Sequence, residues 1–185
     1  MYTHLYKYRY YLLSAAIITV IFGTMYGLVQ QSGRMQANDT PTLLATQVAE
    51  LLDAGLGPQS ASPSLKTDLA KNPMPFVIIY DKQGKAVGGS GYLNAKLAVV
   101  PKGVLEHATA GKNNAVTWQP RSGVRIASVT ATAKDYYVLG GQSLKTTEEH
   151  ASKLLKLTMV GYGVSLAILA TYALIGRFIS SKKTR

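Results

Sequence analysis

The fold is decided by the stretch TTEEHASKLLKLTMVGYGVSLAILATYALIGRFI, residues 146–179. Thr146 and Glu149 have the spacing of a capping box, in which Thr146 caps the amide of Glu149 while the Glu149 side chain reaches back. Residues 157–175 carry no charge, and no proline interrupts the stretch. We therefore predict one helix of roughly 30 residues, about 45 Å long. Its apolar part is long enough to cross a hydrocarbon core roughly 30 Å thick.

A second uncharged stretch lies near the N-terminus, at residues 12–29, and its length of about 18 residues also suits a membrane crossing. The segment before it, residues 1–11, is rich in tyrosine and basic, which is typical of a membrane interface. A basic start and an apolar core also fit a cleaved signal peptide. However, the core is long and no A-x-A-like site follows it, so we predict an uncleaved transmembrane helix.

Both apolar stretches contain small residues four positions apart, Gly23 and Gly27 in the first and Gly161 and Ser165 in the second. This spacing lets helices approach closely. It is compatible with packing of the two spans against each other and with a homodimer.

The charges of the tails indicate how the chain is oriented. The chain has 20 Lys and Arg residues against 9 Asp and Glu, and neither tail contains an acidic residue. Basic residues beside a span tend to stay in the cytoplasm. We therefore predict that both termini, residues 1–11 and 180–185, are cytoplasmic and that residues 30–145 form an extracytoplasmic domain at the plasma membrane. Because anionic lipid accounts for the tail charges, we expect the lipid bilayer, and not nucleic acid, as their partner.

Motifs for catalysis and metal binding are missing from the sequence. The chain has no cysteine, which excludes disulfides, thiolate metal sites and thiol catalysis. Its histidines, His4, His107 and His150, are not at ligand spacing from one another. There is no G-x-S-x-G, P-loop or H-E-x-x-H motif. We therefore predict a protein that is not an enzyme and that has no metal and no cofactor.

Between the two spans the pattern predicts an α+β domain. Thr40 and Pro41 are typical of a helix start, and Gly55 of its end. We predict further short helices at 65–71 and 101–110, and strands at 76–80, 86–93, 115–119, 124–133 and 136–139. Gly140 and Gly141 would release the chain into the long helix 146–179. Because the connections between strands are short, the sheet should be antiparallel, with the N-terminal helices on one face.

A group of polar and aromatic residues offers candidates for binding a ligand: Tyr80, Ser90, Tyr92, Trp118, Arg121, Arg125, Tyr136 and Tyr137. An arginine with aromatic walls is a common way to hold a small carboxylate or amino compound. From this group we select Tyr92, Trp118, Arg125 and Tyr136 as the ligand-binding candidates. The alternative is that Trp118 belongs to the core and that the arginines are ordinary surface residues.

Two segments carry a resemblance to a known family. FVIIYDKQGKAV, residues 76–87, resembles the central hairpin of a PAS-like or Cache-type sensory domain. YVLGGQSL, residues 137–144, running into a long helix, resembles that family's exit from its last strand. The frame of two spans is similar to the input half of bacterial membrane histidine kinases and chemoreceptors. The resemblance implies an exported domain that senses small molecules, ions or physical cues and passes a shift to the second span.

Two functions follow as expectations. The first is a membrane-anchored sensory protein without an output domain of its own, because only residues 180–185 follow the second span. It would act through a membrane histidine kinase or another signalling partner, with a small-molecule ligand. The second is a non-catalytic interaction protein whose exported domain docks another protein.

Overall fold

The computed structural model describes residues 2–109 and 111–182. The chain forms two compact units. One contains the residues up to Ser32 together with those from His150 onward, and the other contains residues Gly33–Glu149.

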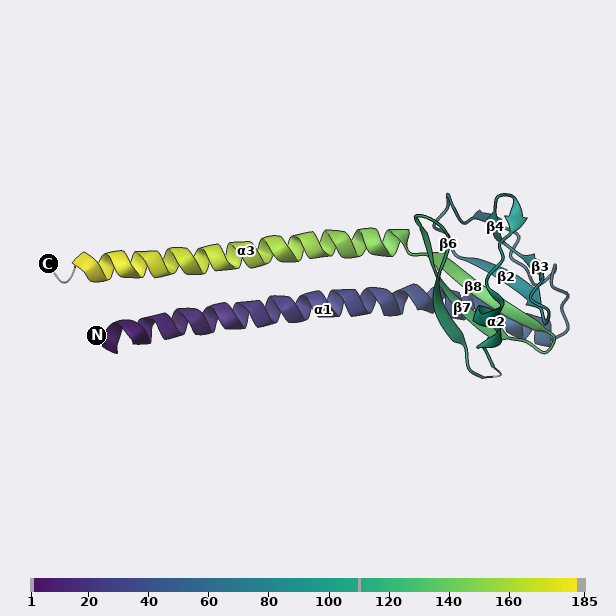
Figure 1. The fold of residues 1–185 in the computed structure, drawn as a ribbon, viewed down its shortest axis with the longest axis horizontal. Helices are drawn as coiled ribbons and strands as arrows, with labels where there is room; N and C mark the ends of the chain where they lie inside the picture. The colour runs from purple at the N-terminus through teal and green to yellow at the C-terminus, as the bar shows by residue number, and fades with distance from the viewer. Residues whose placement is uncertain (1, 110, 183–185) are drawn as a thin grey trace. The chain divides into compact units, whose positions relative to one another are not determined.

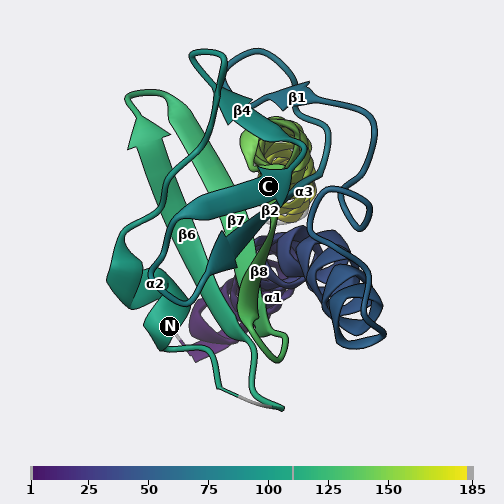
Figure 2. The same cartoon turned by 90° about the vertical axis from the view of Figure 1, so that its right-hand side faces the viewer.

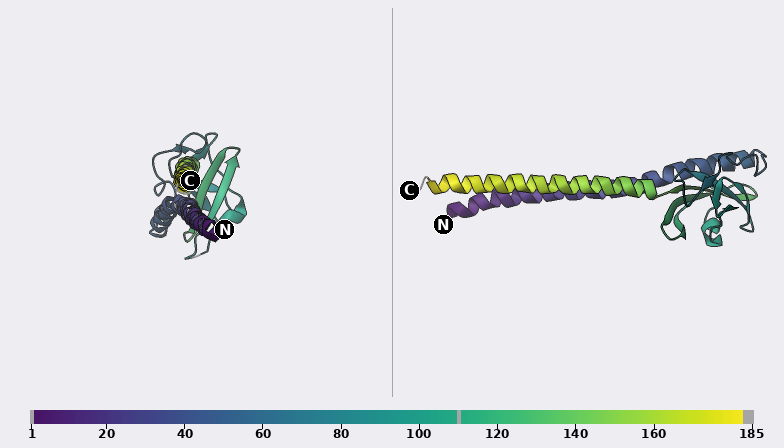
Figure 3. Two further views of the ribbon diagram at one scale, coloured as in Figure 1. Left: turned by 90° about the vertical axis from the view of Figure 1, so that its left-hand side faces the viewer. Right: turned by 90° about the horizontal axis from the view of Figure 1, so that it is seen from above.

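The first unit is a pair of antiparallel helical segments, the N-terminal part of α1 (Tyr2–Asp53) and most of α3 (Lys145–Lys182). Figures 1 and 3 show the two segments side by side. Tyr11 packs edge-on against Tyr172 with ring centroids 6.2 Å apart, and Phe22 packs against Tyr162 at 5.7 Å. Both segments are long and apolar enough to cross a membrane, by length and composition. The two predicted apolar helices are therefore present and packed against each other.

Of the small residues predicted to help the helices approach, Gly161 of α3 lies at the contact and the two glycines of α1 do not. A Cβ at Gly161 would lie 3.1 Å from Cε1 of Phe22, whereas a Cβ at Gly23 or Gly27 would have no atom within 4 Å. A hydrogen bond of 3.0 Å between the hydroxyls of Thr19 and Tyr162 joins the helices at the same level. The intrachain contact therefore uses the small residue of α3 and leaves the Gly23–Gly27 face of α1 open.

The second unit is built on a five-strand antiparallel sheet in the order β3-β2-β8-β7-β6. Figure 2 shows its long strands β6, β7 and β8 next to one another. The strands are β2 (Phe76–Asp81), β3 (Ala86–Gly89), β6 (Asn114–Arg121), β7 (Val124–Thr132) and β8 (Tyr136–Ser143). The predicted antiparallel α+β architecture is confirmed. The last strand is longer than predicted, because Gly140 and Gly141 lie inside β8.

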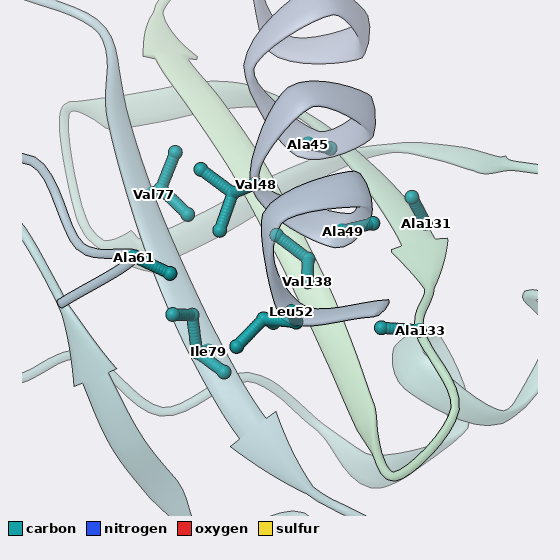
Figure 4. Packing of buried hydrophobic residues seen from close by; sticks show 10 residues of the cluster. All are labelled: Ala45, Val48, Ala49, Leu52, Ala61, Val77, Ile79, Ala131, Ala133 and Val138. Atoms are coloured by element: carbon teal, nitrogen blue, oxygen red, sulfur yellow. The ribbon is translucent and has the colours of Figure 1, made fainter. Parts of the chain in front are cut away.

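One face of the sheet is covered by the C-terminal turns of α1. Figure 4 shows the buried core of this face, which consists of Ala45, Val48, Ala49, Leu52, Ala61, Val77, Ile79, Ala131, Ala133 and Val138. Gly140 lets the helix approach closely, because a Cβ there would overlap the carbonyl oxygen of Pro41. Each fully buried valine, leucine or isoleucine in such a core stabilises the fold by about 1.5–3 kcal/mol.

The other face carries a second core, against which α2 (Lys102–Glu106) packs through Leu105. Alternation along β2 directs Phe76, Ile78 and Tyr80 to this face. They pack with Leu69, Ala98, Val100, Leu105, Trp118, Ile126 and Leu139. Both faces of β2 are therefore buried, which explains its uninterrupted apolar sequence.

Two local predictions for this unit are wrong. Residues 65–71 do not form a helix, because Thr67–Asp68 form strand β1, which pairs in parallel with β4 (Gly91–Leu93). The predicted strand 86–93 is broken at Ser90. Its N–H donates to the carbonyl of Val77 at 2.7 Å, and its Oγ accepts from the Val77 N–H at 3.1 Å. A small sheet, β1-β4-β5 with β5 at Lys96–Leu97, results from this break.

A third correction concerns the helix predicted to begin at Thr40 and Pro41. Helix α1 runs through both residues, with Pro41 in its interior. Proline removes the N–H that would bond the carbonyl four residues earlier. Residues on both sides of it, Ala37 and Ala45, are nevertheless buried, and Ala45 packs in the core of the covered sheet face. The prediction of N-terminal helices on one face holds for α1 alone.

Candidate functional site

The four predicted ligand-binding residues lie in four different surroundings. Trp118 is buried in the second core, and Tyr136 packs against the first. Tyr92 lies on the small sheet, with the Nζ of Lys66 5.3 Å from its ring centroid. Arg125 is exposed at the start of β7. These residues do not line one pocket together.

A hollow of about 780 Å³ is found elsewhere in the domain, at the end of the sheet where the β7–β8 turn lies. Four segments form it: the end of α1, the β2–β3 turn, the β7–β8 turn and the chain after α2. It is lined by Asp53, Lys82, Ala108, Thr109, Gly111, Thr132, Ala133, Lys134 and Tyr137. None of the four predicted ligand-binding residues is among them.

Lys82 holds one wall of this hollow together. Its Nζ donates to the carbonyl oxygens of Ala133 at 3.2 Å and Tyr136 at 3.4 Å. The same ammonium group lies 4.5 Å from the ring centroid of Tyr137, within the range of a cation–π contact. These contacts place the charge of Lys82, an exposed side chain, at the β7–β8 turn.

Asp53 connects the end of α1 to the same turn. Its Oδ1 accepts the N–H of Lys134 at 2.8 Å. The helix ends beside it as predicted, because Gly55 has a φ of +95° and the N–H groups of Gly55 and Leu56 bond back to Leu52 and Leu51, a Schellman motif. The hollow is therefore bordered by α1 and by the strand that leads to α3.

The junction between the sheet and α3 is the second feature that could carry a function. Only Leu144 separates β8 from α3. Its N–H donates to the carbonyl of Arg125 at 2.8 Å, and its own carbonyl accepts the N–H of Glu148 at 2.8 Å. The Arg125 guanidinium donates to the Glu148 carboxylate as well. Arg125 of β7 thus holds Leu144 through its backbone and the first turn of α3 through its side chain.

The start of α3 differs from the predicted capping box. The helix begins at Lys145, so Thr146 lies within the first turn and not before it. The N–H of Lys145 donates a hydrogen bond to Ser143 Oγ at 3.3 Å. Glu149 lies in the same turn and is exposed.

The side chain of Tyr80 is completely buried in the second core. Burial raises the pKa of the Tyr80 hydroxyl far above its usual range, and a backbone hydrogen bond at Val100 opposes this shift only in part. The hydroxyl donates to the carbonyl of Ala98 at 2.7 Å. Tyr80, one of the eight polar and aromatic candidates, is therefore a satisfied core residue. Among residues 2–109 and 111–182, no cluster of His, Cys, Asp and Glu suits a metal ion.

Sequence reasoning missed Asp53, Lys82 and Lys134, and it included Tyr137 only in the wider group of eight. Comparisons with protein-family models, with curated proteins and with solved structures found no match for this chain.

Proposed function

We propose that this protein is a membrane-anchored extracytoplasmic sensory protein that passes changes in its domain across the membrane through α3. The observation that carries this proposal is the junction at Leu144. The central strand β8, which pairs with both β2 and β7, continues into α3 after this single residue. Arg125 holds the first turn of the helix to β7. A displacement of the strand would therefore move the start of α3.

A PAS-like or Cache-type domain is part of the proposal. An antiparallel sheet whose first strand lies between the second and the last, with a long N-terminal helix across one face, supports it. The proposed topology has two spans in the plasma membrane, both termini in the cytoplasm and residues 30–145 outside. The partner would be a membrane histidine kinase or another signalling protein.

Energetically, the proposal needs two states of the domain that differ in the position of α3 relative to α1. A ligand shifts such an equilibrium only by its differential affinity for the two states. The Thr19–Tyr162 hydrogen bond and the Phe22–Tyr162 contact are the interactions that such a shift would rearrange.

The topology can be tested by cysteine labelling, since the natural chain has no cysteine. Ser122→Cys, in the exposed β6–β7 turn, should react with a membrane-impermeant maleimide in intact cells. Ser181→Cys, in the last turn of α3, should react only after permeabilisation. The reverse pattern would refute the topology and the proposed function with it.

Transmission of a change from the domain to the helices can be tested by double electron–electron resonance on the full chain in nanodiscs. Spin labels at Ile17→Cys and Ile168→Cys, both on exposed helix positions, report the distance between the helices. Arg125→Glu should shift this distance, and Arg125→Glu combined with Glu148→Arg should restore it. Arg121→Glu is the matched control, because Arg121 is exposed and forms no ion pair in the described part of the chain. Equal distances in all variants would argue against transmission through α3.

The second proposal is a non-catalytic interaction protein whose domain docks another exported protein. The dispersal of Tyr92, Trp118, Arg125 and Tyr136 over four surroundings favours it over a ligand sensor that uses those residues. Chemical crosslinking in cells, from a photoreactive group on Ser122→Cys, would give a discrete adduct of the full chain if the domain docks a protein. A sensor that works only through its spans would give no such adduct.

A further inference from the structure

We propose that the hollow beside the β7–β8 turn binds a small oxyanion, that is, a carboxylate or a phosphate. Two lysines and one aspartate are the charged residues that line it. Thr109, Thr132 and Tyr137 add hydroxyl groups to the lining, and hydroxyls can donate hydrogen bonds to an anion. A volume of about 780 Å³ is within the range of small-molecule sites.

The position of Lys82 is the strongest argument for an anion. Its ammonium group is held by two carbonyl oxygens and by the ring of Tyr137, none of which carries a formal charge. Within residues 2–109 and 111–182, Lys82 takes part in none of the ion pairs, which include Lys71–Asp68, Lys102–Glu106 and Arg125–Glu148. The charge of Lys82 is therefore positioned but not neutralised, and an anion in the hollow would neutralise it.

Lys134 supplies the second charge. Its backbone is held by Asp53, while its side chain is exposed and forms no ion pair or hydrogen bond in the part of the chain described. Asp53 opposes anion binding, but one of its oxygens already accepts the Lys134 N–H. Two cations against one partly engaged carboxylate leave the lining with a positive balance. That balance selects anions over cations.

Because of where the hollow lies, anion binding would affect the two long helices. This inference rests on the proposed function. An anion held by Lys82 and Lys134 would lie beside the end of α1, at Asp53, and beside the start of β8, at Tyr137. The N-terminal part of α1 is the first proposed span, and β8 leads through Leu144 into α3, which contains the second. Binding would therefore act on both long helices together.

The test is isothermal titration calorimetry of the full chain in phosphatidylcholine nanodiscs, at constant ionic strength in sodium chloride. Inorganic phosphate, acetate and succinate are titrated separately, which distinguishes a phosphate site from a carboxylate site. At least one of them should bind saturably, with one site per chain. Lys82→Gln and Lys134→Gln should each weaken binding about tenfold or more, because a hydrogen bond to a charged group contributes about 1.5–3 kcal/mol and a factor of ten corresponds to about 1.4 kcal/mol.

The matched control is Lys96→Gln, which removes the same charge from an exposed position of β5, outside the hollow. It should leave the affinity within about twofold, because Lys96 is not among the residues that line the hollow and an exposed charge is screened by salt. If Lys82→Gln does not fold, Lys134→Gln still decides, because its side chain forms no contact that the fold needs. Absence of saturable binding for all three anions, or equal weakening by Lys96→Gln and the site variants, would overturn the proposal. Binding without any change in the Ile17–Ile168 label distance would uphold this site and count against the sensory function.

Discussion

The guanidinium of Arg125 at the start of β7 donates to the carboxylate of Glu148 in the first turn of α3. The two side chains are 52% and 48% exposed, and pairs of such exposure contribute at most about 1 kcal/mol. Arg125→Ala should therefore lower the free energy of unfolding by less than about 1 kcal/mol. Urea unfolding followed by the fluorescence of Trp118, the only tryptophan, measures this. A much larger loss would show that the pair is needed for the fold and not only for the junction.

Gly140 should tolerate no side chain. A Cβ there would overlap the carbonyl oxygen of Pro41 and lie 3.2 Å from the backbone nitrogen of Ala45, and helix backbone cannot move aside as a flexible side chain can. Gly140→Ala should destabilise the domain by about 1–3 kcal/mol, as overpacking does. The control is Gly103→Ala in α2, where a Cβ would have no atom within 4 Å. It should stabilise by about 0.5–1 kcal/mol, the difference between glycine and alanine in a helix. Urea unfolding compares the two variants, and equal effects would refute the close approach of α1 to β8.

Two buried hydroxyls should respond in opposite directions. Thr130 is fully buried, and its Oγ1 has no hydrogen-bond partner. Thr130→Val keeps the shape and removes the unsatisfied group, so we expect the domain to become more stable by about 1–2 kcal/mol. Ser90→Ala removes the acceptor of the Val77 N–H and should cost about 1–3 kcal/mol. The midpoints of urea unfolding give both values. A loss of stability in Thr130→Val would indicate that its hydroxyl binds an ordered water or another group.

The parts of the fold that could be predicted are those that depend on local sequence. The length of uncharged sequence at 157–175 is enough to define a long apolar helix, and the β-branched residues of 76–80 define a strand. Gly55 ends α1 because a positive φ is needed there. The start signal at Thr40 and Pro41 was equally local, but α1 runs through both residues and is buried on either side of them, at Ala37 and Ala45.

The hollow could not be predicted, because its residues meet only through the register of distant strands. The contact from Lys82 to the Ala133 carbonyl spans 51 positions, and that from Asp53 to the Lys134 N–H spans 81. Both involve backbone atoms, which carry no sequence signal of their own. The chosen ligand candidates had suitable chemistry, but Trp118 and Arg125 lie on opposite faces of the sheet, as alternation along paired strands requires.

The distance between α1 and α3 should depend on the size of the side chain at position 161 but not at position 163. Gly161→Leu would push against the ring of Phe22, whereas Gly163→Leu would extend into open space. Interaxial distances vary by about 2 Å with the side chains at the contact. Spin labels at Ile17→Cys and Ile168→Cys should therefore report a distance about 1–2 Å longer in Gly161→Leu and unchanged in Gly163→Leu. Equal distances in the two variants would mean that these helices are not packed through Gly161.

Tyr80 should give the domain a loss of stability in alkali. Burial raises the pKa of its hydroxyl above the value of about 10 in an unfolded chain. Between these two values the folded state holds a proton that the unfolded state has released. The free energy of unfolding therefore falls as the pH rises above about 10, by at most about 1.4 kcal/mol per pH unit from this group.

The variant Tyr80→Phe isolates this contribution. At pH 7 it should be less stable by about 1 kcal/mol, because the carbonyl of Ala98 loses its hydrogen-bond donor. Above pH 10 the natural chain should lose stability faster than the variant, so that the gap between them closes and then reverses. Urea unfolding of the full chain at half-unit steps from pH 7 to pH 11 measures the gap through Trp118. Parallel curves for the two chains over that range would show that the Tyr80 hydroxyl ionises as readily in the folded state as in the unfolded one, which a buried and dry second core does not allow.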